Sequence, residues 1–303
     1  MTNLTVFQQE ISALLPDVEL RFFEPLAKHT SFRIGGPAEV IAFPKSTQQL
    51  SVVLKQAAGL GVKPAIIGAG TNILAPDEGL SGLMICLKDC LDGMTLLPED
   101  RLQVAAGVTM SRAAVYAAGK GLSGLEFAHG IPGTVGGGIY MNAGAYGGEI
   151  ADVCCSVDVM TMDGILQTIP AEQMGFSYRH SRLEEEGGIV VSAVFSLIKD
   201  DTARIREKMQ DLMNRRKTSQ PLDLPSAGSA FKRPVGGYAA ALIDQSGLKG
   251  YRVGDAAVSE KHAGFVVNLG QATAKDVRTL LQQVSDIVYE KTQIRLEPEV
   301  RIW

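Results

Sequence analysis

The stretch GLEFAHGIPGTVGGGIYMNAGAYGG, residues 124–148, decides how the rest of this chain is interpreted. Nine of its residues are glycine, a density too high for a helix interior in a segment too poor in branched side chains for a strand. Glycine lacks a Cβ and adopts positive φ readily, so its peptide N–H groups can approach a phosphate or a flat ring directly. We interpret the stretch as backbone held against a ligand, with a structural glycine-rich loop as the alternative.

A second glycine-rich loop supports the ligand interpretation. Residues 66–74, IIGAGTNIL, follow an apolar run and place two glycines and two small polar residues at the exit of a strand. Such exits are common phosphate-binding turns. The loop fails as a dinucleotide fingerprint, because Ile73 stands where the third glycine belongs and no acidic residue closes a second strand at the expected distance. A Rossmann domain is therefore disfavoured.

Composition and charge limit the class of protein. The 303 residues, 46% hydrophobic and 20% charged, are typical of a soluble chain of two or three domains. The net charge of −4 argues against a nucleic-acid surface. No apolar run approaches the roughly 20 residues of a membrane span, and the N-terminus has neither a basic start nor an apolar signal region. We expect a cytoplasmic protein with no membrane or nucleic-acid partner.

The four cysteines, Cys86, Cys90, Cys154 and Cys155, form no Cys-x-x-Cys pair and have no histidine cluster nearby. We expect reduced thiols in the core and no metal site.

Periodicity and turn residues predict a mixed α and β chain. Ser46 and Gln49 form a capping box at the start of a helix that lies between two strands, as in a β-α-β unit. Asp163 and Gly164 predict a tight turn, and Thr273 with Asp276 predicts the cap of a long C-terminal helix. The predicted helices are 6–15, 46–58, 109–119, 202–216 and 273–288, and the predicted strands are 39–43, 65–68, 83–87, 102–106, 152–162, 188–197 and 294–303. Residues 217–225, with two prolines and no period, are predicted to be a linker.

Seven short motifs follow one another in an order that closely resembles the UDP-N-acetylenolpyruvoylglucosamine reductase family (MurB), flavoenzymes of bacterial peptidoglycan synthesis. The motifs are TSFRIGGPA (30–38), GAGTN (68–72), GIPGTVGGG (130–138), NAGAYG (142–147), YRHS (178–181), GSAFK (228–232) and LEPEV (296–300). The resemblance extends over about residues 22–303. The short span from residue 236 to 262 leaves little room for the tyrosine-bearing insertion of the larger subtype, so the chain resembles the shorter one.

The resemblance implies an α+β fold in three regions. Residues 1–100 and 101–216 would be the two α+β subdomains of an FAD-binding fold of the vanillyl-alcohol oxidase type, and residues 217–303 an α+β substrate-binding domain. It also implies a two-step hydride relay, in which NADPH reduces non-covalent FAD and flavin N5 then reduces the enolpyruvyl ether of UDP-N-acetylglucosamine to UDP-N-acetylmuramate. The associated roles are cell-wall synthesis, cell shape and cell division.

Three residues are predicted to be catalytic. The planar fork of Arg179 matches a carboxylate or enolate oxygen. Ser229 lies in a tightly turned, glycine-flanked setting, where its hydroxyl could donate a proton if Lys232 stabilises the alkoxide. Glu299, two residues after Glu297 on the predicted final strand and so on the same face, is the family's catalytic carboxylate, acting with Arg179 on the intermediate.

Further site residues follow from the motifs. The predicted cofactor-binding residues are Gly68, Gly70, Thr71, Asn72, Gly130, Gly133, Thr134, Gly137 and Gly138. The predicted substrate-binding residues are Tyr178, Lys232, Arg233 and Arg301. Arg233 stands where many members have asparagine, and His180 where an acidic residue is usual. Two alternatives stay open, another oxidase or dehydrogenase of the same flavin fold and a UDP-sugar binding protein without flavin.

Overall fold

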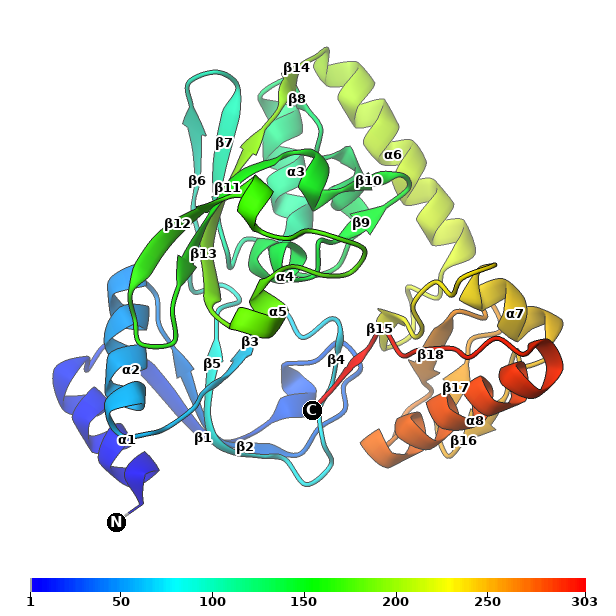
Figure 1. Ribbon diagram of the computed structural model, residues 1–303, viewed down its shortest axis with the longest axis horizontal. Coiled ribbons are helices and arrows are strands. Elements are labelled where there is room, and N and C mark those ends of the chain that lie inside the picture. Colours follow the sequence, from blue (N-terminus) through cyan, green and yellow to red (C-terminus); the bar gives the residue numbers. More distant parts are fainter. Residues whose placement is uncertain (1) are drawn as a thin grey trace. The chain divides into compact units, whose positions relative to one another are not determined.

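The computed structural model describes residues 2–303 and has the predicted α+β fold (Figure 1). The chain divides into two compact units. Unit 1 comprises the segments up to Phe22, Val40–Ala69 and Gly82–Asn214, and unit 2 comprises Phe23–Glu39, Gly70–Ser81 and Arg215–Trp303. Each unit has its own buried hydrophobic core. Unit 2 therefore joins two short segments from the first hundred residues to the C-terminal part of the chain, and the predicted three-region division remains a prediction.

A four-stranded sheet in the order β1-β2-β5-β3 follows the N-terminal helix. The elements are α1 (Asn3–Leu14), β1 (Glu19–Pro25), β2 (Pro37–Phe43), α2 (Thr47–Gly59), β3 (Ala65–Ile67) and β5 (Leu80–Cys86). The predicted β-α-β unit is present as β2, α2 and β3, with β5 between its two strands. Ser46 caps α2 as predicted, because its Oγ accepts from the N–H of Gln49, while the Gln49 side chain accepts from the N–H of Lys45.

The second sheet of unit 1 is antiparallel throughout and has the order β12-β11-β13-β7-β6. Its strands are β6 (Met94–Leu97), β7 (Arg101–Ala105), β11 (Cys154–Met160), β12 (Leu166–Pro170) and β13 (Ile189–Ser196). Strands β7, β11 and β13 were predicted, whereas β6 and β12 were not. The predicted turn at Asp163 and Gly164 joins β11 to β12, with Gly164 at φ 78° and its N–H bonded to the carbonyl of Thr161.

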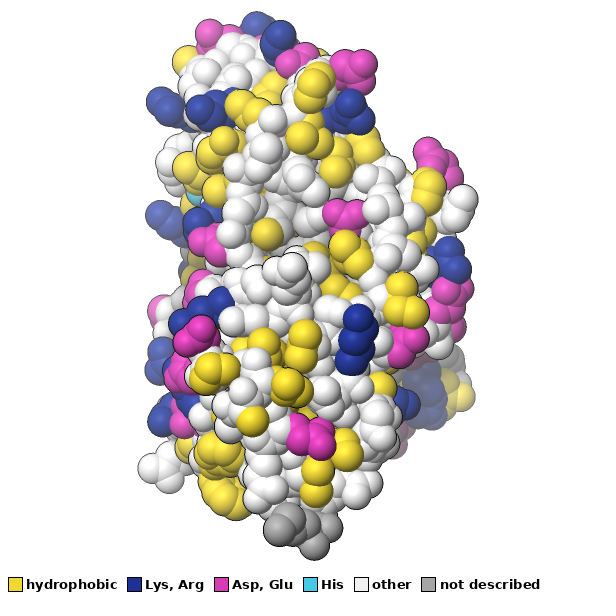
Figure 2. Space-filling view, turned by 90° about the vertical axis from the view of Figure 1, so that its left-hand side faces the viewer, with side chains coloured by type: hydrophobic (Ala, Val, Ile, Leu, Met, Phe, Trp, Pro, Cys, Tyr) yellow, Lys and Arg dark blue, Asp and Glu magenta, His cyan; other side chains and the backbone are white. Residues whose placement is uncertain are grey.

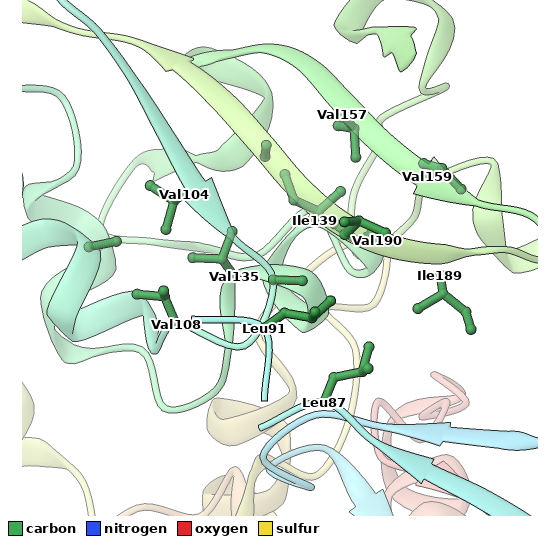
Figure 3. Close-up of a cluster of buried hydrophobic side chains, with 14 of the residues drawn as sticks. Leu87, Leu91, Val104, Val108, Val135, Ile139, Val157, Val159, Ile189 and Val190 are labelled. Atoms are coloured by element: carbon green, nitrogen blue, oxygen red, sulfur yellow. The ribbon is translucent and has the colours of Figure 1, made fainter. Parts of the chain in front are cut away.

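The glycine run was wrongly predicted to be non-helical. Residues Val135–Tyr140 form helix α4, which follows helix α3 (Met110–Gly119) and packs on β13. Val135 and Ile139 of α4 lie among buried valines of the sheet and two leucines, Leu87 and Leu91, of the segment after β5 (Figure 3). A Cβ at Gly136 would lie 3.0 Å from the Cβ of Ala106, so the glycine is what allows this approach. Burial of the apolar face outweighs the poor helix propensity of glycine.

A long polar helix, α6 (Thr202–Ser219), ends the second half of unit 1 and enters unit 2. It continues three residues beyond the predicted end at Arg216, so Lys217–Ser219 are helical and not part of a linker. Residues 220–225, which contain both prolines, have no regular structure and connect α6 to the next strand.

Unit 2 contains an antiparallel sheet in the order β15-β18-β17-β16 with two helices. The elements are β15 (Ser226–Ser229), α7 (Ala239–Gln245), β16 (Arg252–Val253), β17 (Ala256–Val258), β18 (Phe265–Asn268) and α8 (Ala274–Thr292). The predicted cap of α8 is confirmed, because the side chains of Thr273 and Asp276 each accept the other's backbone N–H at 3.0 Å. The carboxylate of Asp77 also accepts the N–H groups of Ala274 and Lys275.

The C-terminal strand is much shorter than predicted. Only β19 (Arg301–Ile302) is extended in a ladder, and it pairs in parallel with β4 (Ile73–Leu74). Residues 294–300 are irregular apart from a single bridge between Pro298 and Phe231. The expectation that Glu297 and Glu299 share one face of a strand is therefore wrong. An alternating sequence forms a strand only where a partner strand is present. The partner here, β4, is only two residues long, so only two C-terminal residues pair with it.

The remaining elements are short. They are η1 (Leu26–Lys28), η2 (Glu126–Gly130), η3 (Ile150–Asp152), η4 (Ala171–Gln173), α5 (Leu183–Glu186), the pair β8 (Leu122–Ser123) and β14 (Ile198–Lys199), and the pair β9 (Gly144–Ala145) and β10 (Gly148–Glu149).

All four cysteines are free thiols; Cys86 and Cys90 are buried as expected, whereas Cys154 and Cys155 are only partly buried. Burial raises the pKa of Cys90 to about 11 and that of Cys154 to about 12, so both stay protonated at neutral pH. Within residues 2–303, no group of three or more His, Cys, Asp or Glu side chains is placed to hold a metal ion.

The surface mixes charges of both signs. On the face shown in Figure 2, Lys and Arg side chains lie among Asp, Glu and scattered hydrophobic side chains. Over the described part of the chain, no helix combines the length and the apolar character that crossing a membrane requires.

The cap of α8 gives a first prediction. Thr273→Ala should lower the free energy of unfolding by about 1 kcal/mol, because the N–H of Asp276 loses its acceptor. Thr273→Ser retains the oxygen and should stay close to the parent protein. Urea titrations followed by circular dichroism measure both, and a serine variant as unstable as the alanine variant would contradict the hydrogen-bond explanation.

Candidate active site

Two glycine loops meet in unit 1 through one threonine. Gly68 follows β3, and a Cβ built on it would lie 2.5 Å from Oγ1 of Thr134. Thr134 is buried, caps α4 by accepting the N–H of Gly137, and forms a β-bridge with Thr109. The structure thus brings together the predicted cofactor residues Gly68, Thr134 and Gly137.

The segment before α4 is anchored to the start of α3. The N–H of Met110 donates to the carbonyl of Gly133 at 3.0 Å, and Gly133 has a φ of 128° that favours glycine. Gly138 lies one helical turn further on, where a Cβ would be 2.8 Å from the sulfur of Met110. The backbone conformation of Gly133 and the packing of Gly138 against Met110 therefore favour glycine at these positions without any ligand.

Gly137 is different, and it tests whether these loops fit a flavin nucleotide. A Cβ at Gly137 would meet only Oγ1 of Thr134, at an ordinary contact distance of 3.7 Å, and the residue is exposed with a normal helical φ. Nothing in the described protein requires glycine there. A ligand that approaches the backbone closely would require it, so this surface fits the FAD that the sequence predicts.

Hydrogen bonds of Glu126 and His129, which the sequence did not predict, hold the beginning of the glycine stretch. The buried carboxylate of Glu126 accepts from Ser123 Oγ at 2.6 Å and from the N–H of Gly124 at 2.9 Å. Burial alone would raise the pKa of Glu126, but these hydrogen bonds hold it below its usual value. His129 Nδ1 lies 3.3 Å from Ser111 Oγ, and burial lowers the pKa of His129, which favours the neutral ring.

The predicted catalytic Arg179 lies at the tip of a tight turn in unit 1. Its φ is 58°, a costly conformation for a non-glycine residue, and the backbone groups of Ser177 and His180 bond reciprocally across it. Its guanidinium donates to the carbonyl of Gly144 at 3.3 Å and stacks 5.2 Å from the ring centre of Tyr178. The structure therefore places Arg179 and the predicted substrate residue Tyr178 side by side.

Two fully buried polar side chains fix this turn to the NAGAYG motif and to the end of α4. Asn142 donates to the carbonyl of Ser177 at 3.0 Å and accepts the N–H of Ala151. Ser181 donates to the carbonyl of Tyr140 at 2.8 Å. Asn142 and Ser181 stand in quoted motifs but received no role from the sequence, because their partners are 35 and 41 residues away.

Unit 2 contains the other half of the 66–74 loop. Gly70 has a φ of 59°, and a Cβ there would lie 2.0 Å from the carbonyl oxygen of His29, so only glycine fits. Two residues later, the side chain of Asn72 donates to the carbonyl of Glu299 at 3.1 Å. The carbonyl of Asn72 accepts the N–H of Arg301 at 2.9 Å. Predicted cofactor and catalytic residues are thus adjacent within this unit; Thr71 lies between Gly70 and Asn72 and is partly buried.

The segments of Ser229 and Glu299 also meet in unit 2. Ser229 ends β15 opposite Phe265, after Gly228 with a φ of 75°. The N–H of Glu299 donates to the carbonyl of Ala230 at 2.9 Å, directly beside Ser229.

The exposed loop after Ser229 holds two predicted substrate residues. The Lys232 ammonium lies 3.9 Å from the carboxylate of Glu297, and the Arg233 guanidinium lies 4.4 Å from the ring centre of Tyr238. Both side chains are solvent-exposed and positively charged. The predicted site residues are divided between the two units, with Arg179 and Tyr178 in unit 1 and Ser229, Lys232, Arg233, Glu299 and Arg301 in unit 2.

Comparisons with known proteins define first the class and then the family. Residues 38–169 match the FAD binding domain, and residues 220–303 match the C-terminal domain of UDP-N-acetylenolpyruvoylglucosamine reductase. The chain is 45% identical to the UDP-N-acetylenolpyruvoylglucosamine reductase of Latilactobacillus sakei, over 94% of this chain and 93% of that protein. It is 44% identical to the reductase of Agathobacter rectalis, over 98% of each chain. The crystal structure of the Thermus caldophilus enzyme (MurB) superposes with a TM-score of 0.81 at 37% identity, covering 94% of this chain and 98% of that one.

The chain therefore belongs to the UDP-N-acetylenolpyruvoylglucosamine reductase family. The predicted family and FAD-binding fold are confirmed. The roles of individual site residues stay predictions.

The contrast between neighbouring glycines of α4 gives a second prediction. Gly137→Ala should stabilise the flavin-free protein by about 0.5–1 kcal/mol, because alanine favours the helix and has room, yet it should weaken FAD binding. At Gly136 the same gain in helix propensity is opposed by the contact of the new Cβ with the Cβ of Ala106 at 3.0 Å, so Gly136→Ala should be less stable than Gly137→Ala. Denaturant titration of the apoprotein and flavin fluorescence titration measure the two effects. Unchanged FAD affinity in the Gly137 variant would remove this residue from the cofactor site.

Proposed function

We propose that this chain reduces UDP-N-acetylenolpyruvoylglucosamine to UDP-N-acetylmuramate with NADPH, as an FAD-containing enzyme of peptidoglycan precursor synthesis. Membership of the reductase family over nearly the whole chain supports the reaction. The observation on which the assignment of residues rests is the hydrogen bond from the N–H of Glu299 to the carbonyl of Ala230. It holds the segment of the proposed carboxylate against that of the proposed proton donor.

The proposed cofactor is FAD held without a covalent bond, at Gly68, Gly70, Thr71, Asn72, Gly130, Gly133, Thr134, Gly137 and Gly138. When bound and reduced by NADPH, FAD supplies a hydride for the methylene carbon of the enolpyruvyl group. The contribution of the protein is then to hold the substrate carboxylate, to stabilise negative charge and to deliver one proton to the neighbouring carbon.

Arg179 is proposed to bind the substrate carboxylate and the enolate that hydride addition creates. The reciprocal bonds between Ser177 and His180 fix the strained turn at Arg179, and the Tyr178 ring lies beside its guanidinium. A cation fixed in advance stabilises developing negative charge without reorganising during the reaction. Tyr178, Lys232, Arg233 and Arg301 are the proposed contacts for the remainder of the UDP-sugar.

Ser229 is proposed to donate the proton to the carbon next to the one that receives hydride. A serine hydroxyl is a weak acid, so the alkoxide left behind needs a nearby positive charge. Lys232, three residues further along the chain and exposed, is the proposed source of that charge. Glu299 is proposed to act on the same intermediate together with Arg179.

The proposed partners are small molecules only, NADPH and the UDP-sugar, and the proposed location is the cytoplasm.

A third prediction concerns the flavin. If FAD is bound only by non-covalent contacts, acid precipitation of the purified yellow protein should release all of it into the supernatant, where its absorbance can be read. His129 is the tempting attachment point, but its Nδ1 faces Ser111. Flavin that stays with the pellet would contradict the proposed mode of binding.

The fourth prediction separates the two half-reactions. Ser229→Ala should leave FAD content and NADPH-driven flavin bleaching near normal, because no proton donor is needed at the substrate carbon in that step. Reoxidation by UDP-N-acetylenolpyruvoylglucosamine should slow by about 10²–10⁴-fold, the usual effect of a lost general acid. Stopped-flow absorbance records each half separately.

Ser226→Ala is the matched control, because it removes a hydroxyl from the other end of the same strand. It should reoxidise at the parent rate. Equal slowing in both serine variants would point to damage of β15, and a parent rate in the Ser229 variant would show that this serine is not the acid.

A further inference from the structure

Asn72 makes two hydrogen bonds that enclose one buried residue of the C-terminal segment. Its side-chain Nδ2 donates to the carbonyl of Glu299 at 3.1 Å, and its own carbonyl accepts the N–H of Arg301 at 2.9 Å. Val300, which lies between Glu299 and Arg301 in the chain, is buried. Asn72 directly precedes β4, so its side chain extends the β4–β19 ladder by one further bond. All these residues belong to unit 2.

The chemistry of the contact fixes the orientation of the Asn72 amide. A backbone carbonyl is only an acceptor, so the NH₂ group and not the amide oxygen must face Glu299. An aspartate of the same shape would place a carboxylate oxygen against the carbonyl oxygen, and two acceptors repel each other. An alanine would leave the carbonyl without this donor.

Glu299 is held on its other side by the segment of Ser229. Its N–H donates to the carbonyl of Ala230 at 2.9 Å, and the neighbouring Pro298 forms a bridge with Phe231. Both backbone groups of Glu299 are therefore engaged, one by Asn72 and one by the residue beside Ser229. This segment is otherwise irregular, so these bonds replace the strand pairing that would normally fix a residue.

We propose that Asn72 is a positioning residue for Glu299, in addition to any contact it makes with the cofactor. The inference rests on the proposed function, in which Glu299 acts on the substrate intermediate. Asn72 fixes the carbonyl side of Glu299 and so sets the point from which the carboxylate projects. A misplacement of about 1 Å in a catalytic group can cost about 10²-fold in rate, so loss of this bond should slow the chemistry at the substrate.

The test uses full-length holoprotein saturated with FAD. At saturating FAD, Asn72→Asp and Asn72→Ala should slow reoxidation by the enolpyruvyl substrate about 10- to 100-fold more than they slow NADPH-driven flavin reduction. Stopped-flow traces at saturating substrate supply both rates. If either variant instead loses flavin affinity and, once saturated, reoxidises normally, Asn72 is a cofactor contact only and the proposal is wrong.

Asn268→Asp provides a matched control in the same unit. The buried Asn268 side chain also donates to a backbone carbonyl, that of Phe32, at 3.0 Å, and its oxygen accepts the N–H groups of Gly270 and Ala272. Aspartate removes the same kind of donor there without touching Glu299. The proposal requires that this variant, even if destabilised, reoxidises at the parent rate. A loss equal to that of Asn72→Asp would show a general effect of weakening unit 2 and would overturn the proposal.

A double-mutant cycle with Glu299→Gln separates this inference from the proposed function. If Asn72 acts through Glu299, the double variant should reoxidise hardly more slowly than Glu299→Gln alone, because the positioned carboxylate is already lost. If the rate losses of the two single variants instead multiply in the double variant, the proposal for Asn72 is overturned. If Glu299→Gln alone reoxidises at the parent rate, the fault lies in the proposed catalytic role of Glu299, and the positioning role falls with it.

Discussion

Unit 1 depends on the close contact between Gly68 and Thr134. Any side chain at Gly68 would collide with the Thr134 hydroxyl, because its Cβ would lie 2.5 Å from Oγ1 of Thr134. That hydroxyl also accepts the N–H of Gly137 at the start of α4, and the backbone of Thr134 forms the bridge with Thr109 at the start of α3. One side chain therefore joins a loop from the first sheet to the beginnings of two helices. The surface we propose for FAD exists because this junction excludes side chains.

Unit 2 depends on backbone hydrogen bonds to an irregular segment. Residues 294–300 form no strand ladder, and the carbonyl and N–H of Glu299 are held by Asn72 and Ala230. The core beneath is contributed by Leu296 and Val300, which are buried among residues of α8 and β18. Burial of the apolar side chains holds the segment against the core, while the hydrogen bonds determine which of its residues lies opposite each partner. Precise placement of a carboxylate needs both, because burial alone has no direction.

The sequence predicted those parts of the fold that have a strong local signal. Ser46 and Thr273 mark helix starts because a side-chain oxygen satisfies an N–H three residues away, which involves no distant partner. Helix α4 could not be predicted, since Val135 and Ile139 gain their stability from a sheet formed by residues far along the chain. The C-terminal strand was overpredicted for the converse reason, because its partner β4 is only two residues long.

The sequence predicted which residues form the candidate site, but not the hydrogen bonds that hold them in place. Motifs named Arg179, Ser229 and Glu299, but the bonds that fix them join residues up to 227 positions apart, as Asn72 and Glu299 are. A single sequence contains no local signal for such pairs. Asn72 was predicted to bind the cofactor because it matches the family's pyrophosphate loop, and the structure adds a partner within the protein for its side-chain nitrogen.

Glycine density overstated the case for a ligand. Gly136, Gly144 and Gly148 each have a neighbouring residue within 3.0 Å of where a Cβ would lie, so packing alone accounts for them. Gly124 has a φ of 130°, which accounts for it by backbone conformation. Gly137 has neither reason, and it is the position from which a ligand can be inferred. A glycine that packing and backbone conformation do not require leaves room for a ligand to approach the backbone, and Gly137 is such a position in this stretch.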